Sequence, residues 1–256
     1  TNICFSNPEA RRIQAQYIAD YAEKQNNVDF IHIWLADQTN NHCECPECQK
    51  KMKALGVETY AEYQNFFMNR IIGYLESKNR HAIVWNEAAK GENLDKRAII
   101  QYWKETPAPS VKFLNNGGKA ILSPFSYCYF DYDYHTTPLN RVYSLDANLK
   151  GLTEEGKKNI IGFEATVWTE YISDTKRFEE FVFPRIIAVS KAAHGENSKP
   201  YKEFLDDVRT LRNKLTDYAF CDEKMWTKPR ISTVYGWLKF VKDRYSVNYI
   251  KEQLFK

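Results

Sequence analysis

Short apolar segments alternate with amphipathic helical segments along much of this chain, and this alternation limits the possible folds more than any other feature. It is typical of α/β proteins with a parallel sheet, because each parallel strand must be linked to the next by a crossover. We expect six strands, at Ile3, Phe30, Ile83, Ile100, Ile121 and Gly162. A closed (β/α)8 barrel requires eight. Two strands are therefore either unrecognised or absent from this chain.

The helices are predicted from capping residues and from the spacing of apolar side chains. Asn7 or Ser6 can cap a first helix, and Pro8 suits its first turn. Pro184 falls inside another helical segment, where it should start or kink a turn. The expected helices span about residues 8–24, 58–77 and 178–193, with two or three more from Tyr201 onward.

Charge and composition argue against several classes of partner. The 36 basic and 33 acidic residues give a net charge of +3, and residues of the two signs are interspersed along the chain without long blocks of one sign. This pattern is not typical of nucleic-acid or membrane-surface proteins. No apolar run is long enough to span a bilayer. No signal peptide opens the chain, but we still expect a secreted or periplasmic protein.

Aromatic residues make up 15% of the chain, and many stand beside carboxylates where strands are expected to end. An aromatic core would explain the composition alone, whereas a carbohydrate site would also use the aromatic rings to pack sugar C–H faces. In a barrel, side chains at the carboxyl ends of the strands line the mouth of the active site. The residues at or after those ends are Asp37, Trp85, Glu87, Trp103, Tyr129, Asp131, Trp168 and Glu170. Together they predict glycoside hydrolysis, which needs an acid and nearby negative charge.

Two stretches carry a resemblance to a known family. Residues 30–33, the helix from Tyr63 to Leu75 and residues 82–87 are similar in order and spacing to the β-N-acetylhexosaminidases of glycoside hydrolase family 20. Residues 162–171, followed by 183–189, resemble the family's final strand and the helix after it. The resemblance covers about residues 1–195 and implies strands 3 to 8 of a (β/α)8 TIM barrel.

This resemblance implies that the first two strands come from upstream sequence or from a partner chain. Residues 196–256 would then form a C-terminal helical extension packed on the barrel. An open parallel edge would expose unpaired backbone groups, so a stable protein should cover it.

The resemblance also implies a mechanism and roles for individual residues. The substrate's own 2-acetamido oxygen would attack the anomeric carbon, so that a β-N-acetylhexosaminide is cleaved with retention. Tyr129 would hydrogen-bond that acetamido oxygen, and Asp131 and Glu170 would bind sugar hydroxyls. The walls around the sugar ring would be Trp85, Trp103 and Trp168.

The family's Asp-Glu pair is altered in this sequence. Its places hold Ala36 and Asp37, or Asp37 and Gln38 after a shift of one residue. Asp37 could act as a shorter acid, or it could orient the acetamido group while Glu87 donates the proton. Loss of an orienting contact costs about 2–4 kcal/mol of transition-state stabilisation, so a slow or inactive enzyme is also conceivable.

A second, shorter resemblance suggests an alternative activity. Residues 34–48 look like a segment of the family 163 endo-β-N-acetylglucosaminidases, which act on N-glycans. A third alternative is a sugar-binding descendant without catalysis, since aromatic walls beside a broken acid pair would suit such a protein.

Three of the six cysteines, Cys43, Cys45 and Cys48, stand within six residues. With a fourth ligand, His42 or a distant cysteine, they could hold a structural Zn²⁺. A disulfide or free thiols are the alternatives. We expect Cys4 and Cys128 to be buried and inert. No other cofactor is expected.

Overall fold

The computed structural model describes residues 4–25, 27–33 and 43–227. The chain divides into two compact units, the first made of residues 1–122 and 147–162 and the second of 123–146 and 163–256. The family-based division at residue 195 is a different one, and it stays a prediction. In the part of the chain that is described, no helix is both long and apolar enough to cross a membrane.

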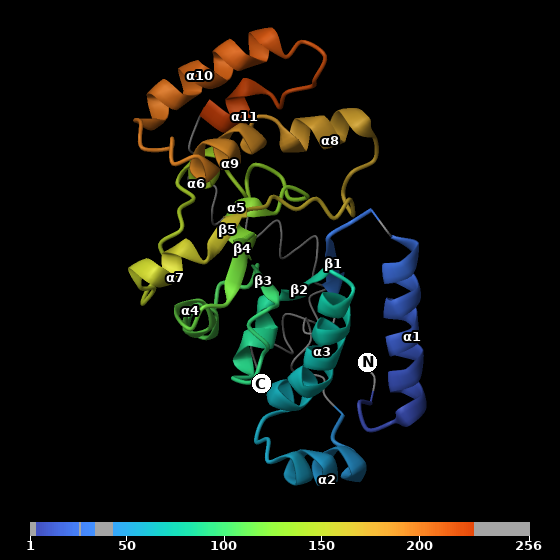
Figure 1. Cartoon of the computed structure of the whole chain (residues 1–256). Helices are drawn as coiled ribbons and strands as arrows, with labels where there is room; N and C mark the ends of the chain where they lie inside the picture. The colour runs from blue at the N-terminus through green and yellow to red at the C-terminus, as the bar shows by residue number, and fades with distance from the viewer. Residues whose placement is uncertain (1–3, 26, 34–42, 228–256) are drawn as a thin grey trace, which may run out of the picture. The chain divides into compact units, whose positions relative to one another are not determined.

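The first unit is built on a sheet whose strand order follows the sequence, β1-β2-β3-β4-β5 (Figure 1). The first three pairings are parallel, with Ile31 beside Ala82, Val84 beside Ile100 and Ile100 beside Ala120. The strands are β1 (Phe30–Ile33), β2 (His81–Trp85), β3 (Ile99–Tyr102), β4 (Lys119–Leu122) and β5 (Ile160–Phe163), whose last residue begins the second unit. This parallel, in-order arrangement confirms the α/β prediction.

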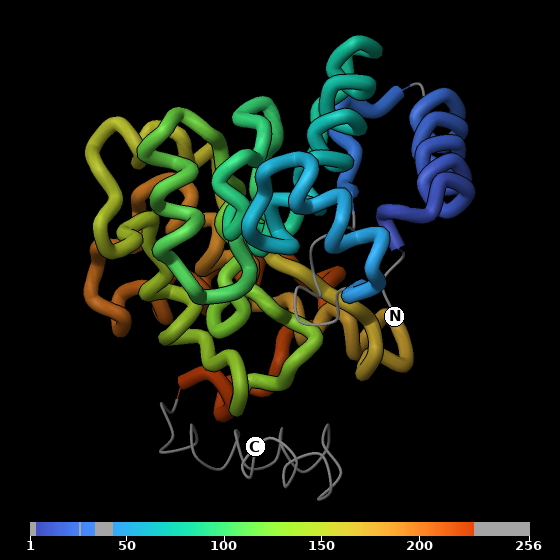
Figure 2. The backbone as a smooth tube through the Cα atoms, turned by 90° about the horizontal axis from the view of Figure 1, so that it is seen from below, coloured from blue at the N-terminus to red at the C-terminus, as the bar shows by residue number. Residues whose placement is uncertain are grey.

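Five helices and one 3₁₀ turn of the described chain accompany this sheet. They are α1 (Pro8–Lys24), α2 (Pro46–Leu55), α3 (Tyr60–Ser77), η1 (Asn86–Lys90), α4 (Pro107–Asn115) and α7 (Glu154–Lys158). α3 begins at a capping box in which Thr59 and Glu62 each bond the other's backbone. Its apolar face is buried, with Tyr63, Ile72 and Leu75 fully covered. α1 and α3 lie side by side in both views (Figures 1 and 2).

The prediction of a strand at Ile3-Cys4-Phe5 is wrong for the two residues that the structure describes, Cys4 and Phe5. Cys4 has no regular structure, and Phe5 and Ser6 form a turn closed by a 3.0 Å hydrogen bond from Asn7 N to Cys4 O. Asn7 then caps α1, accepting from the backbone N–H groups of its first turn. Residues 4–6 therefore form a turn that leads into the N-cap of α1, and they do not form a strand. Ile3 itself lies outside the described residues.

The second unit is mostly helical. Its helices are α5 (Phe125–Cys128), α6 (Leu139–Tyr143), α8 (Thr175–Val182), α9 (Arg185–Ala193), α10 (Tyr201–Lys214) and α11 (Glu223–Thr227). One core includes Val142 of α6, Ala188 of α9, Phe204 of α10 and Trp226 of α11. The single helix expected over 178–193 is wrong, because Pro184, which has no N–H, separates α8 from α9.

Candidate functional site

Two tryptophans at the ends of neighbouring strands form an aromatic corner in the first unit. Trp85 ends β2, and Trp103 directly follows β3. Their ring centroids are 6.1 Å apart with planes at 69°, and the ring centroids of His32 and Trp85 are 4.5 Å apart. Trp85 is buried and Trp103 is half-buried. Parallel pairing explains the proximity, because it brings the carboxyl ends of β2 and β3 to the same edge.

The buried carboxylate of Glu87 holds Trp103 in place. Its Oε2 accepts a 2.9 Å hydrogen bond from Trp103 Nε1, and the Lys104 ammonium lies 3.7 Å from Oε1. Glu87 is 1% exposed, and Lys104 also stands 5.5 Å above the Trp103 ring centroid. A carboxylate bonded to the indole N–H fixes the angle of that ring. Glu87 therefore serves in this structure as a positioning group.

Asn86 supplies a second restraint that sequence analysis did not identify. Its Oδ1 accepts from the backbone N–H groups of Trp103 and Lys104, both at 3.2 Å. Its Nδ2 donates to Lys104 O at 3.0 Å and to Ser110 Oγ at 3.3 Å. Asn86 thus satisfies the backbone just after β3 and connects it to α4. Burial at 2% exposure makes each of these bonds costly to lose.

The pKa of His32 is lowered by its surroundings. Desolvation by neighbouring groups lowers its pKa to about 4, although the residue is exposed in the described structure, and a hydrogen bond with Gln101 opposes this shift. Because Gln101 can donate or accept, it can pair with a neutral imidazole. His32 thus belongs to the aromatic corner as an uncharged ring.

A second aromatic group lies in the second unit and includes Tyr129 and Trp168. The backbone of residues 128–130 pairs with Thr166: Thr166 N donates to Cys128 O and Phe130 N donates to Thr166 O, both at 2.9 Å. This bridge brings the Tyr129 and Trp168 rings to 6.4 Å. Tyr129 is 6% exposed and Trp168 is 38% exposed. An exposed tryptophan face beside a buried tyrosine can stack a sugar ring and bond its substituent.

The two carboxylates of this group differ in environment. Asp131 is 2% exposed, whereas Glu170 is exposed. Thr169 stands between Trp168 and Glu170 with a backbone φ of +65°, which is unusual for a β-branched residue. Thr169 also begins a turn, because its carbonyl oxygen accepts from Ile172 N at 3.1 Å. Backbone strain is concentrated at functional sites in proteins.

Arg185 supports the loop that follows Tyr129. It is fully buried and donates to the carbonyl oxygens of Phe130, Tyr132 and Thr137 at 2.9, 2.8 and 3.2 Å. Its guanidinium carbon lies 4.4 Å from the ring centroid of Tyr134. Burial lowers the pKa of this guanidinium. Arg185 is therefore a structural anchor.

Four cysteine sulfurs gather at one place in the first unit. The ligand atoms of Cys4, Cys43, Cys45 and Cys48 all lie within 4.8 Å of one another, and none forms a disulfide. Cys4 is half-buried and not buried as expected, and the turn before α1 brings it to the other three. Cys128, in contrast, is buried in the apolar core of the second unit as predicted.

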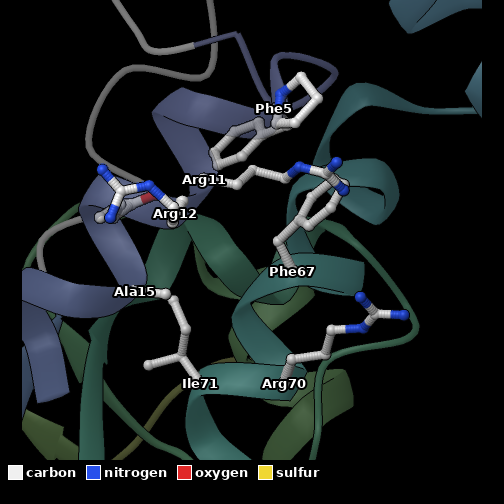
Figure 3. Close-up of a pocket in the computed structure, with 9 residues that line it drawn as sticks. Phe5, Arg11, Arg12, Ala15, Phe67, Arg70 and Ile71 are labelled. Carbon is white, nitrogen blue, oxygen red and sulfur yellow. The ribbon is translucent and has the colours of Figure 1, made fainter.

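A pocket of about 400 Å³ lies between α1 and α3 (Figure 3). The Arg11 guanidinium reaches over the Phe67 ring at 5.3 Å, and Phe5 stacks on the same ring at 5.2 Å. The lining residues are Phe5, Pro8, Arg11, Arg12, Gln14, Ala15, Phe67, Arg70 and Ile71. None of the predicted site residues is among them.

Asp37, the residue predicted to be the acid or orienting group, lies outside the described residues. The structure therefore places Trp85, Glu87 and Trp103 together in one unit, and Tyr129 and Trp168 together in the other.

The family model of the glycosyl hydrolase family 20 catalytic domain matches residues 1–195. The chain belongs to glycosyl hydrolase family 20. The catalytic domain of this family is a (β/α)8 barrel, and the five-stranded sheet is consistent with part of one. The match covers the same residues as the sequence resemblance.

Individual relatives are similar at a modest level. A β-hexosaminidase of Porphyromonas gingivalis is 26% identical over 181 residues, which cover 66% of this chain and 23% of the relative. A human β-hexosaminidase subunit beta is 26% identical, with 63% of this chain and 30% of the relative covered. The chain thus spans about a quarter to a third of these relatives.

Solved structures agree on the fold. The family 20 exo-β-N-acetylglucosaminidase of Vibrio harveyi, in complex with N-acetylglucosamine, has a TM-score of 0.68 at 22% identity and covers 83% of this chain and 35% of that one. The chitobiase of Flavobacterium johnsoniae has a TM-score of 0.68 at 24% identity, with 83% and 33% covered.

Proposed function

We propose that this chain forms most of the active site of a β-N-acetylhexosaminidase, a retaining glycosidase that releases N-acetylhexosamine from β-linked substrates. The observation that carries the proposal is the family 20 match over residues 1–195, within which the aromatic and acidic strand-end residues all fall. The relatives named above are β-hexosaminidases, which favours this activity over endo cleavage of N-glycans.

The proposed reaction needs no enzyme nucleophile. The 2-acetamido oxygen attacks the anomeric carbon, the glycosidic C–O bond breaks, and an acid protonates the leaving oxygen. Water then attacks the anomeric carbon of the cyclic intermediate and restores the acetamido group. Tyr129 would donate to the acetamido oxygen, and Trp85, Trp103 and Trp168 would contact the sugar ring.

Asp37 is the better candidate for the acid or orienting group. The Glu87 carboxylate is already bonded to Trp103 and faces Lys104, and it is almost completely buried. A general acid must reach the leaving oxygen within hydrogen-bond distance. We therefore give Glu87 the task of positioning Trp103 and Asp37 the task of contacting substrate.

The active protein would contain further barrel elements, from upstream sequence or from a partner chain. In the described part of the chain, β1 stands at the edge of the sheet, and its Phe30 is 50% exposed. α1 exposes Ile13, Tyr17 and Tyr21, which are four residues apart and lie on one helix face. An exposed apolar helix stripe and an exposed edge strand each favour cover by additional elements.

The test is release of p-nitrophenol from its β-N-acetylglucosaminide and β-N-acetylgalactosaminide, using protein that includes any upstream strands. We expect turnover, and we expect Asp37→Asn to lower kcat by a hundredfold or more. Glu44→Gln, at an exposed position near the cysteines, is the matched control and should keep activity. Asp37→Asn with unchanged turnover would refute the role of Asp37.

Folded protein without turnover would refute the exo-glycosidase and direct the next assay to an N-glycan. Sugar binding without either activity would favour the non-catalytic alternative. For binding, Trp168→Ala should weaken N-acetylglucosamine affinity about tenfold or more, since a stacked aromatic ring is removed. Unchanged affinity would show that Trp168 does not contact the sugar.

A further inference from the structure

The four-cysteine cluster has the dimensions of a closed tetrahedral metal site. Cys4 Sγ lies 3.7 Å from Cys45 Sγ and 3.6 Å from Cys48 Sγ. A tetrahedron with Zn–S bonds of about 2.3 Å has sulfur separations of about 3.8 Å. A disulfide bond is about 2.05 Å, and all four cysteines are free. The observed spacing therefore matches ligands around one ion.

We propose that Cys4, Cys43, Cys45 and Cys48 bind one Zn²⁺ ion as a structural site. Four sulfur ligands in a tetrahedron are typical of zinc or of iron–sulfur centres, because thiolates are soft donors and zinc accepts tetrahedral geometry. A four-iron cluster has a separate iron for each cysteine, so it requires sulfurs spread more widely than these. All four positions would be occupied by protein, which leaves no place for a substrate or for water.

The surroundings of the cluster support ligation by thiolates. Cys45 is the N-cap residue of α2, and Cys48 lies in the first turn of that helix. The positive end of the helix dipole favours negative charge there. Ser6 Oγ donates to Cys48 Sγ at 3.1 Å and is bonded to Tyr63 OH at 2.9 Å. Hydrogen bonds of this kind orient the ligands of metal sites.

The site joins two segments that are distant in sequence. Cys4 precedes α1, whereas the other three ligands follow residues 34–42, and the separations to Cys45 and Cys48 are 41 and 44 residues. Cys48 is 0% exposed and packs with Phe5 and Tyr63 in a small apolar core. An ion would fix the chain on the carboxyl side of the segment that contains Asp37. This inference does not depend on glycosidase activity.

The experiment is metal analysis by mass spectrometry of protein purified without a histidine tag and without added metal. We expect about one zinc per chain. Cys45→Ser should lower that content at least tenfold, and its fold should survive because serine is a favoured N-cap residue for α2. Cys221→Ser makes the same chemical change at a half-buried cysteine outside the cluster, and it should keep the zinc.

Cobalt provides a second measurement. Replacement of zinc by Co²⁺ should give the visible absorption typical of tetrahedral cobalt with four thiolates, and Cys4→Ser should change that spectrum. Wild-type protein with neither zinc nor cobalt binding would overturn the proposal, as would an intact mass lower by two hydrogen atoms for each of two disulfides. Iron in place of zinc, or equal zinc in Cys45→Ser and Cys221→Ser, would also overturn it.

Discussion

Replacement of Arg185 by methionine should destabilise the second unit strongly. The methionine keeps an unbranched apolar stem in the buried site but removes every donor. Four carbonyl oxygens would lose their partner, those of Phe130, Tyr132 and Thr137 in the loop and that of Phe181 in α8. Each buried hydrogen bond contributes about 1 kcal/mol net, and an unsatisfied carbonyl costs about 1–3 kcal/mol.

These terms sum to a loss of about 4 kcal/mol or more, and stacking on the Tyr134 ring adds to it. The free energy of desolvating the guanidinium is recovered in the variant and offsets part of the loss. We therefore expect the free energy of unfolding to fall by about 3–5 kcal/mol. The midpoint of thermal unfolding should fall by roughly 10 °C.

Urea titration followed by tryptophan fluorescence measures this difference. Arg212→Met is the control, because Arg212 is exposed and its nearest carboxylate oxygen, on Glu223, lies 3.8 Å away. It should change stability by less than about 0.5 kcal/mol. Arg185→Lys should recover less than half of the loss, since an ammonium lacks the planar fork that reaches several carbonyls. A loss below about 1 kcal/mol in Arg185→Met would refute the anchoring argument.

Three further predictions concern single side chains of the candidate site. Glu87→Gln keeps an acceptor for the Trp103 indole, so it should lower kcat less than about tenfold. If kcat fell more than a hundredfold and one of the two ionisations disappeared from the pH profile of the activity, Glu87 would be the acid. Thr169→Asn should raise the free energy of unfolding by about 1 kcal/mol in a urea titration, because asparagine tolerates positive φ; equal or lower stability would contradict strain at this position. The pKa of His32 is about 4 in the folded state, below the unfolded value of 6.5. Its contribution to the free energy of unfolding is therefore fully present above about pH 6.5 and is lost as the pH falls toward 4. An NMR titration of the His32 ring should show it neutral at pH 5.5, and a midpoint near 6.5 would contradict this.

Local sequence patterns predicted the strands of the first unit well. Apolar runs at Phe30, Ile83, Ile100 and Ile121 all became parallel strands, because each run places at least two buried residues in the sheet. The pattern failed at Phe5, where an apolar run precedes a strong helix cap and the backbone turns to satisfy it. Pro184 was expected to start or kink a turn, and α9 does begin directly after it, although the helix before it ends sooner than expected.

Contacts between distant residues were the part that sequence could not provide. Strand-end position predicted that Trp85 and Trp103 would be neighbours, yet nothing in the sequence indicates that Glu87 bonds the Trp103 indole. The fourth ligand was left open as His42 or a distant cysteine, and the sequence could not single out Cys4 for the same reason. Cys4 is about 40 residues from its partners, and only the turn before α1 shows that it reaches them.

Three buried polar residues, Asn86, Glu87 and Arg185, share one structural role. Asn86 and Glu87 restrain Trp103, and Arg185 restrains the loop after Tyr129, each through hydrogen bonds that an apolar residue could not make. A binding wall is useful only if its angle is fixed before the sugar arrives, because ordering a ring on binding costs free energy. The carboxylate and guanidinium nearest the aromatic rings are therefore better explained as groups that pre-organise the site than as groups that react. This interpretation leaves proton transfer to another carboxylate, which is the role proposed for Asp37.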